Sequence, residues 1–184
     1  PPVDVSWLTA IAAAGDVDGD GYDDVLVAGT NTAGPDPINV YAGSATGLGS
    51  SPVAALMDYG AEVAGAGDVD GDGYSDVVTG EQGAAYVFRG TPEGLSSEPA
   101  VFLQGLPIGG NGGVSFAGAG DVDGDGYDDV VVGAEVNEGS SSSRGVANVY
   151  AGSPDGPAGQ PTPTLEDPAA SENFGVSVAG VGDL

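Results

Sequence analysis

The chain has 184 residues, a length typical of one domain, and 28 acidic residues against two basic ones, Arg89 and Arg144. The formal net charge of -26 argues against nucleic acid and anionic membrane as partners, because their phosphates would repel the chain. Hydrophobic residues make up 40% of the sequence, which argues against disorder, and 35 Gly with 13 Pro indicate the many tight turns of an all-β protein. No apolar stretch approaches the ~20 residues of a membrane span, so we expect no membrane insertion.

A unit of four short strands recurs three times along the chain. Each unit starts with a strand of small residues, passes through an acidic loop into an apolar strand, and ends with a third strand and a weaker fourth. The acidic loops begin at Asp16, Asp68 and Asp121, so the period is roughly 50 residues. The predicted strands are 11–15, 25–27, 39–43 and 53–57 in the first unit, 63–67, 77–79, 86–90 and 100–103 in the second, and 116–120, 130–132, 148–152 and 162–165 in the third.

Four short strands in roughly 50 residues are typical of one β-propeller blade. The strand of small residues would be innermost, because Ala and Gly let backbones approach at the centre, and aromatic residues of the third strand would fill the space between blades. The sequence therefore predicts an all-β fold of four-stranded antiparallel propeller blades. We divide the single segment 1–184 into approximate blades 7–57, 58–104 and 112–166, with the start of a further blade at 173–184.

Flanking strands are also predicted, at residues 3–6 for a preceding blade and at residues 174–182 for a following one. Three blades do not close a ring, because propellers have about four to eight. We therefore expect either a fragment of a longer propeller, which we favour, or a chain that closes the ring by self-association.

The acidic loops read DVDGDGYDD at 16–24, DVDGDGYSD at 68–76 and DVDGDGYDD at 121–129. Carboxylates at alternate positions of a curled loop converge on one point, and the Gly at position 6 permits a sharp turn. Hard oxygen ligands at this density suit Ca²⁺ better than Mg²⁺, and Zn²⁺ or copper would need the His or Cys that the chain lacks. The predicted ligands, carboxylates and Tyr backbone carbonyls, are Asp16, Asp18, Asp20, Tyr22, Asp24, Asp68, Asp70, Asp72, Tyr74, Asp76, Asp121, Asp123, Asp125, Tyr127 and Asp129.

Ordinary turns are the alternative interpretation of such loops, but three near-identical copies at blade spacing favour about three calcium ions, one per complete loop. The loops hold half of the 28 acids, a density that is unfavourable without a cation. They are not EF-hands, because position 12 carries no Glu. We expect a structural role for the metal, and we interpret Asp23 and Asp128, which Ser75 replaces in the second loop, as solvated surface acids.

The chain resembles the FG-GAP repeats of integrin α-subunit propellers. The calcium positions match in all three loops, and Tyr59-Gly60 and Phe174-Gly175 match the aromatic-Gly of the family pattern. Trp7-Leu8 matches it in part, and the Gly-Ala-Pro element is degenerate. The resemblance implies a propeller with calcium loops on one face and ligand-binding connections on the other. Calcium propellers of lectins and secreted surface proteins are similar as well.

The sequence leaves three classes of function to compare. The first is an extracellular module for binding or adhesion, with a glycan, as in a lectin, or a protein as its ligand. Its candidate ligand-binding residues lie on the opposite connections: Asn31, Asn111, Asn137 and Arg144. The second is a structural spacer or protein–protein interaction domain of a larger secreted protein. The third, an enzyme, is disfavoured because the chain has no His, Cys or Lys.

Two aromatic residues, Trp7 and Tyr59, could stack on a sugar, but we expect both to pack between blades. Calcium is abundant outside cells, where loops of this kind fill readily. We therefore expect a secreted or cell-surface protein.

Overall fold

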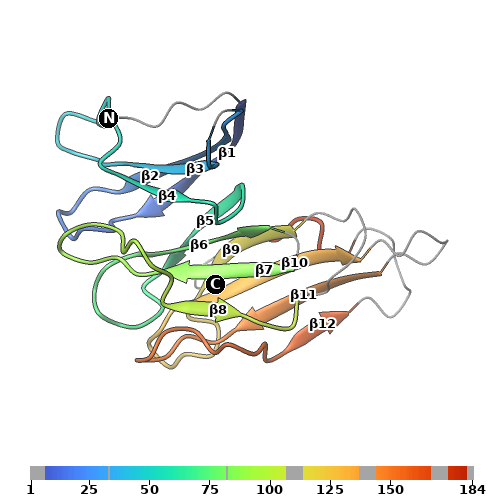
Figure 1. Cartoon of the computed structure of the whole chain (residues 1–184). Coiled ribbons are helices and arrows are strands. Elements are labelled where there is room, and N and C mark those ends of the chain that lie inside the picture. Colours follow the sequence, from blue (N-terminus) through green and yellow to red (C-terminus); the bar gives the residue numbers. More distant parts are fainter. Residues whose placement is uncertain are drawn as a thin grey trace.

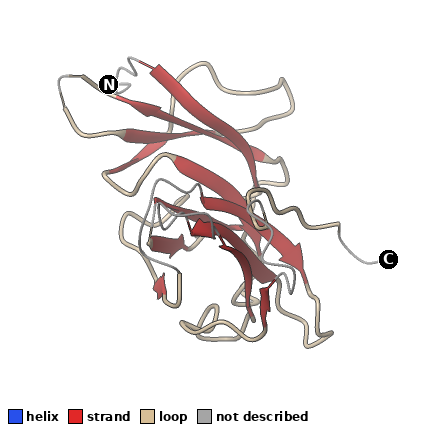
Figure 2. Cartoon of the chain, turned by 90° about the vertical axis from the view of Figure 1, so that its right-hand side faces the viewer, coloured by secondary structure: helices blue, strands red, loops and turns tan. Residues whose placement is uncertain are grey.

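The computed structural model describes residues 7–32, 34–81, 83–106, 114–136, 144–166 and 174–181. In this part of the chain there are three antiparallel sheets of four strands each and no helix (Figures 1 and 2), which confirms the predicted all-β blades. The predicted flanking strand at 3–6 lies outside the described residues. The first sheet contains β1 (Trp7–Gly15), β2 (Asp24–Thr30), β3 (Pro37–Tyr41) and β4 (Ala54–Met57). The second contains β5 (Glu62–Gly67), β6 (Asp76–Glu81), β7 (Ala84–Phe88) and β8 (Val101–Leu103). The third contains β9 (Val114–Gly120), β10 (Asp129–Val136), β11 (Arg144–Tyr150) and β12 (Thr164–Glu166).

Each sheet is a meander in which consecutive strands pair in order. The first hairpin of each sheet closes on a pair of residues that flank an acidic loop, Gly15 with Asp24 in the first sheet. The same pairing joins Gly67 to Asp76 and Gly120 to Asp129. Because the strands alternate in direction, the acidic loops and the β2–β3 type of connection lie at opposite ends of each sheet.

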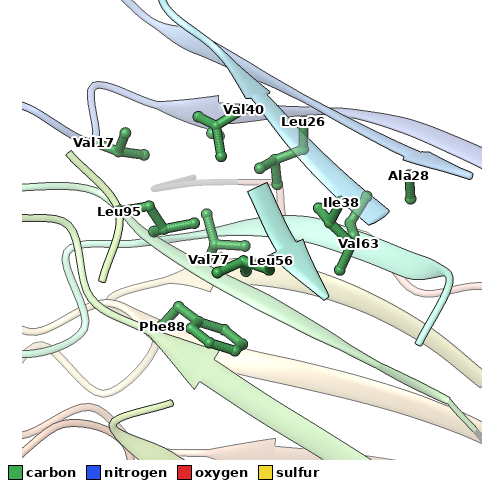
Figure 3. Close-up of a cluster of buried hydrophobic side chains, with 11 residues drawn as sticks. Val17, Leu26, Ala28, Ile38, Val40, Leu56, Val63, Val77, Phe88 and Leu95 are labelled. Atoms are coloured by element: carbon green, nitrogen blue, oxygen red, sulfur yellow. The ribbon is translucent and has the colours of Figure 1, made fainter. Parts of the chain in front are cut away.

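Two hydrophobic cores lie between consecutive sheets. Val77 and Val78, neighbours on β6, point to opposite faces of the second sheet, as the period of two in a strand requires. Val77 packs with Leu26 and Ile38 of the first sheet (Figure 3), whereas Val78 packs with Val130 of the third. Each blade is therefore stabilised mainly by its neighbours rather than by a core of its own, as in other repeat architectures.

Between neighbouring sheets, the closest contacts are made by the strands of small residues, β1, β5 and β9. A Cβ built on Gly65 would lie 2.7 Å from the carbonyl oxygen of Ala13, and one built on Gly118 would lie 2.8 Å from that of Ala66. These contacts join β1 to β5 and β5 to β9, so the Gly-rich pattern is explained by backbone packing at the inner edge. A hollow of about 320 Å³ opens beside these strands, lined mainly by glycines together with Ala14, Ala66, Ser75 and Asp128.

Residues 174–181 continue this inner packing. A Cβ on Gly180 would contact the carbonyl oxygen of Gly118, just as one on Gly118 would lie 3.0 Å from that of Gly65. Ser115 donates a hydrogen bond from its hydroxyl to the carbonyl of Gly175 at 3.2 Å. The segment has no strand ladder, but it lies where the inner strand of a following blade is expected.

No sheet formed by the described residues packs on the outer face of the first sheet. Phe88 and Tyr150, at the ends of β7 and β11, are fully buried between sheets as predicted, whereas the equivalent Tyr41 is only half-buried. Tyr59 packs edge-on against Phe88, with ring centroids 4.8 Å apart, which confirms its predicted blade packing. The same prediction is wrong for Trp7, which is 71% exposed, because no sheet of the described residues packs over it.

Candidate metal centres

The first carboxylate of each acidic loop closes the loop on itself. Asp16 accepts backbone hydrogen bonds from Gly19 at 2.8 Å, from Asp20 at 3.1 Å and from Gly21 at 2.8 Å. The two glycines have φ values of 74° and 90°, so both adopt the left-handed conformation that favours Gly. The same three bonds are made by Asp68 and by Asp121. The three loops therefore share one conformation.

The last carboxylate of each loop anchors it to the sheet. Asp24 is buried at the start of β2, where it accepts the N–H of Val17 at 3.1 Å and the N–H of Gly43 at 2.8 Å. The second bond ties the loop to the residues that follow β3. Asp76 and Asp129 make the equivalent pairs of bonds in the other two sheets.

Three carboxylates converge in each loop. Ligand oxygens of Asp16, Asp18 and Asp24 all lie within 4.8 Å of one another, and so do those of two equivalent triads, Asp68 with Asp70 and Asp76, and Asp121 with Asp123 and Asp129. These nine residues are nine of the predicted ligands, and an all-oxygen donor set of this kind fits Ca²⁺. The calcium assignment stays a prediction that this geometry fits.

The remaining predicted ligands lie outside these triads. Asp20 instead accepts the N–H of Tyr22 at 2.9 Å, and Asp72 and Asp125 make the equivalent bonds to Tyr74 and Tyr127. Coordination by these aspartates and by the Tyr carbonyls therefore stays a prediction. One oxygen of each aspartate is engaged in these bonds, which leaves the other available to a cation.

Without a cation, the buried positions of two loop carboxylates disfavour their ionised forms. Burial, with a smaller contribution from the nearby charges of Asp70 and Asp72, raises the pKa of Asp76 from 3.8 to about 7, against the effect of its two backbone hydrogen bonds. Burial likewise raises the pKa of Asp24. A divalent cation would offset both effects, because it stabilises the ionised form.

Successive loops contact one another across the boundary between blades. Position 8 of one loop donates its N–H to the carbonyl of position 1 in the preceding loop, from Ser75 to Asp16 at 2.9 Å and from Asp128 to Asp68 at 3.0 Å. The carboxylate of Asp128 also accepts the N–H of Asp68 at 2.9 Å. The interpretation of Asp128 as a solvated surface acid is therefore wrong, since it links two blades, whereas the equivalent Asp23 is exposed as predicted.

Two further loop positions, the Tyr at position 7 and the Val at position 2, take part in this contact, which the sequence did not predict. The ring of Tyr74 lies over Gly19, and that of Tyr127 lies over Gly71. Val17 and Val69, at position 2, are 2% and 0% exposed under the next blade, whereas Val122 is 63% exposed. Only the recurrence of Tyr and Val in every loop could have drawn attention to them.

The four candidate ligand-binding residues remain a prediction. The backbone N–H of Asn31, in the turn after β2, donates to Asp36 at 2.8 Å. Arg144 is the first residue of β11, and nothing is described of its side chain. Asn111 and Asn137 lie outside the described residues.

The sequence model of the FG-GAP-like repeat matches residues 16–79 and 68–132, each stretch running from one acidic loop through the next. The chain belongs to the FG-GAP-like repeat family. This confirms the resemblance that the acidic loops indicated.

Among the relatives of this FG-GAP chain, integrin alpha-5 of Xenopus laevis is 37% identical over 87 residues, which cover 41% of this chain and 8% of the relative. Integrin alpha-4 of Xenopus laevis is 30% identical over 153 residues, 72% of this chain and 15% of the relative. Integrin alpha pat-2 of Caenorhabditis briggsae is 31% identical over 155 residues, 66% of this chain and 13% of the relative. The chain thus spans a small part of the length of each. None of its described residues form a helix with the length and hydropathy needed to cross a membrane.

Proposed function

We propose that this FG-GAP segment is a calcium-stabilised, extracellular binding or adhesion module with no catalytic role. The observation that carries the proposal is the recurrence of one carboxylate triad at the same place in three blades. Each triad lies in a loop that also contacts the neighbouring blade, so a bound ion would stabilise both the hairpin and the boundary between blades. Its relatives are integrin alpha chains, which supports adhesion as the setting. Extracellular calcium, at millimolar concentration, would keep such loops filled.

Calcium titration and chelation test whether the loops bind the metal and whether the metal stabilises the fold. We expect about three calcium ions per chain by isothermal titration, and a large fall in melting temperature in EDTA, because a ligand that binds only the folded state stabilises it by mass action. Restoring excess calcium should restore the melting temperature. An unchanged melt after thorough chelation would overturn the calcium proposal.

We propose that the ligand, a glycan or a protein, binds the connections at the end of the blades opposite the acidic loops. At this end, the backbone N–H of Asn31 in the turn after β2 donates to the carboxylate of Asp36 at 2.8 Å. A glycan array with the folded, calcium-loaded chain distinguishes the two ligand classes. Binding to one sugar class would indicate a lectin. If a folded sample binds no glycan on the array, the lectin function is excluded and a protein ligand is favoured.

A spacer role is the second candidate, and the composition of the described hollow favours it. Small residues line most of that hollow and offer few polar groups for a ligand. As a spacer or protein–protein interaction domain of a larger secreted protein, the segment would need only rigid blades and an acidic, soluble surface.

We further propose that the face of the third blade beyond its acidic loop binds another blade of the same kind, either from a longer propeller of which this segment is a part, the alternative favoured above, or from a second copy of the chain. Gly124 has open space above it, where the equivalent Gly19 and Gly71 each carry a Tyr ring, and Val122 beside it is exposed. The first blade offers the missing Tyr, since Tyr22 is 44% exposed. If a second copy supplies the blade, sedimentation velocity should show head-to-tail association that Val122→Asp weakens, and a monomer at all concentrations would exclude the second copy.

A further inference from the structure

The second acidic loop differs from the other two by an internal cation. Arg89, which directly follows β7, places its Nε 2.8 Å from Oδ2 of Asp70, the carboxylate at position 3 of that loop. The equivalent positions in the first and third units are Ala42 and Ala151, in Tyr-Ala-Gly sequences where the second unit has Phe-Arg-Gly. The ion pair is therefore peculiar to the second blade.

This pair is not an ordinary surface salt bridge. The Asp70 side chain is only 3% exposed, and that of Arg89 is 37% exposed, so solvent screens the pair less than it screens two exposed side chains. A Cβ on Gly156 would lie 3.6 Å from Arg89 Nη2, which places the guanidinium at the boundary between the second and third blades. The Nε is buried and makes no well-aligned hydrogen bond to a described atom, so charge is what joins it to Asp70.

The pair changes the charge that the loop offers to a metal. Asp70 converges with Asp68 and Asp76, and its Oδ1 already accepts the N–H of Asp72 at 3.2 Å. Its Oδ2 contacts Arg89 instead, and is an oxygen that a cation and Arg89 would share. The second loop also has Ser75 where the first and third loops have an additional aspartate. Fewer negative charges and one fixed positive charge both lower the affinity of an oxygen site for Ca²⁺.

We propose that Arg89 lowers the calcium affinity of the second loop below that of the first, and replaces part of the ion's charge when the loop is empty. The inference rests on the calcium-binding function proposed above. The first loop is the matched comparison, because both loops are covered by a following blade, with Val17 and Val69 equally buried. In this arrangement the second blade depends less than the first on calcium for its stability.

Amide NMR resolves the loops one by one. The N–H groups of Gly21, Gly73 and Gly126 each donate to the first carboxylate of their own loop, so their chemical shifts report its occupancy. In the wild type we expect Gly73 to respond at a higher calcium concentration than Gly21. In Arg89→Gln we expect the midpoint of Gly73 to fall by about tenfold, with Gly21 and Gly126 unchanged.

Two variants control for charge. Arg89→Lys keeps a positive charge at this place and should retain the wild-type midpoint of Gly73. Ser51→Glu makes the same change in net charge as Arg89→Gln at an exposed residue of the first blade, and should leave Gly73 unchanged. A second readout is independent of titration. In EDTA, Arg89→Gln should melt below the wild type, and calcium should raise its melting temperature by more than it raises that of the wild type.

The outcomes separate the two proposals. If all three glycines respond to calcium but Gly73 does not move in Arg89→Gln, the role of Arg89 is refuted and the calcium sites stand. If none of the three responds, the calcium-binding function fails and this inference fails with it.

Discussion

The contact between a Tyr ring and a loop glycine offers a test within one chain. Gly71 and Gly124 occupy the same position of two loops, with φ values of 75° and 78°. A Cβ on Gly71 would lie 2.6 Å from Cε1 of Tyr127, whereas a Cβ on Gly124 would meet nothing within 4 Å. An Ala at either position therefore carries the same backbone free-energy cost. Only at Gly71 does the new Cβ also collide with a side chain.

The structure gives the size of both effects. A left-handed Ala costs about 1–2 kcal/mol relative to Gly, and this applies to both variants. Displacing the Tyr127 ring adds the cost of overpacking, typically about 1–3 kcal/mol. We therefore expect Gly124→Ala to lose about 1–2 kcal/mol of unfolding free energy and Gly71→Ala to lose about 2–5 kcal/mol.

Urea unfolding in saturating calcium, followed by tyrosine fluorescence and circular dichroism, measures the difference. Gly19→Ala is a replicate, because Tyr74 lies 2.6 Å from the Cβ built there. It should match Gly71→Ala. Equal losses for Gly71→Ala and Gly124→Ala would refute the argument that the ring of one blade packs on the loop of the preceding one.

Two other predictions follow from the same boundary and from the buried acids. Val69→Ala removes two methyl groups that are fully buried under the third blade, so it should cost about 2 kcal/mol, whereas Val122→Ala, at a 63% exposed residue, should stay within about 0.5 kcal/mol of the wild type in the same urea assay. Similar costs for the two would count against burial of position 2. Without calcium, stability should fall as pH rises from about 4 to 7, because folded Asp76, with its pKa raised from 3.8 to about 7, keeps a proton that the unfolded chain has already lost. The fall is about 4 kcal/mol over the whole range, of which about 2–3 kcal/mol lies between pH 5 and pH 8, where urea titrations in EDTA should show it, while stability that rises with pH would contradict the assignment.

The sequence predicted the parts of this molecule that lie within one repeat. Each predicted strand of the three units falls on an observed one, because small residues, acidic loop and apolar run recur in fixed order. The roles of the loop glycines and of the converging aspartates were likewise predictable from the sequence, because a loop of nine residues determines its own conformation.

Contacts between repeats were not predictable in the same way. The first and third loops have the same nine residues, yet Val17 is 2% exposed and Val122 is 63% exposed. The difference is that a following blade covers the first loop, whereas no described blade covers the third. The residues of a loop do not encode whether another blade follows. The prediction for Asp128 was wrong for the same reason, because its carboxylate accepts a hydrogen bond from a backbone N–H 60 residues earlier in the chain. The pairing of Arg89 with Asp70 also depends on how two segments meet, and no spacing rule indicated it.

The contacts between loops have a direction, since each is completed by groups that lie later in the chain. Ser75 and Tyr74 reach back to the first loop, and Asp128 and Tyr127 reach back to the second. A chain that emerges from the ribosome with its N-terminus first therefore covers each loop only after the following blade has been synthesised. Packing between blades would follow one blade behind the point of synthesis, so a stalled product would carry one uncovered loop at its growing end.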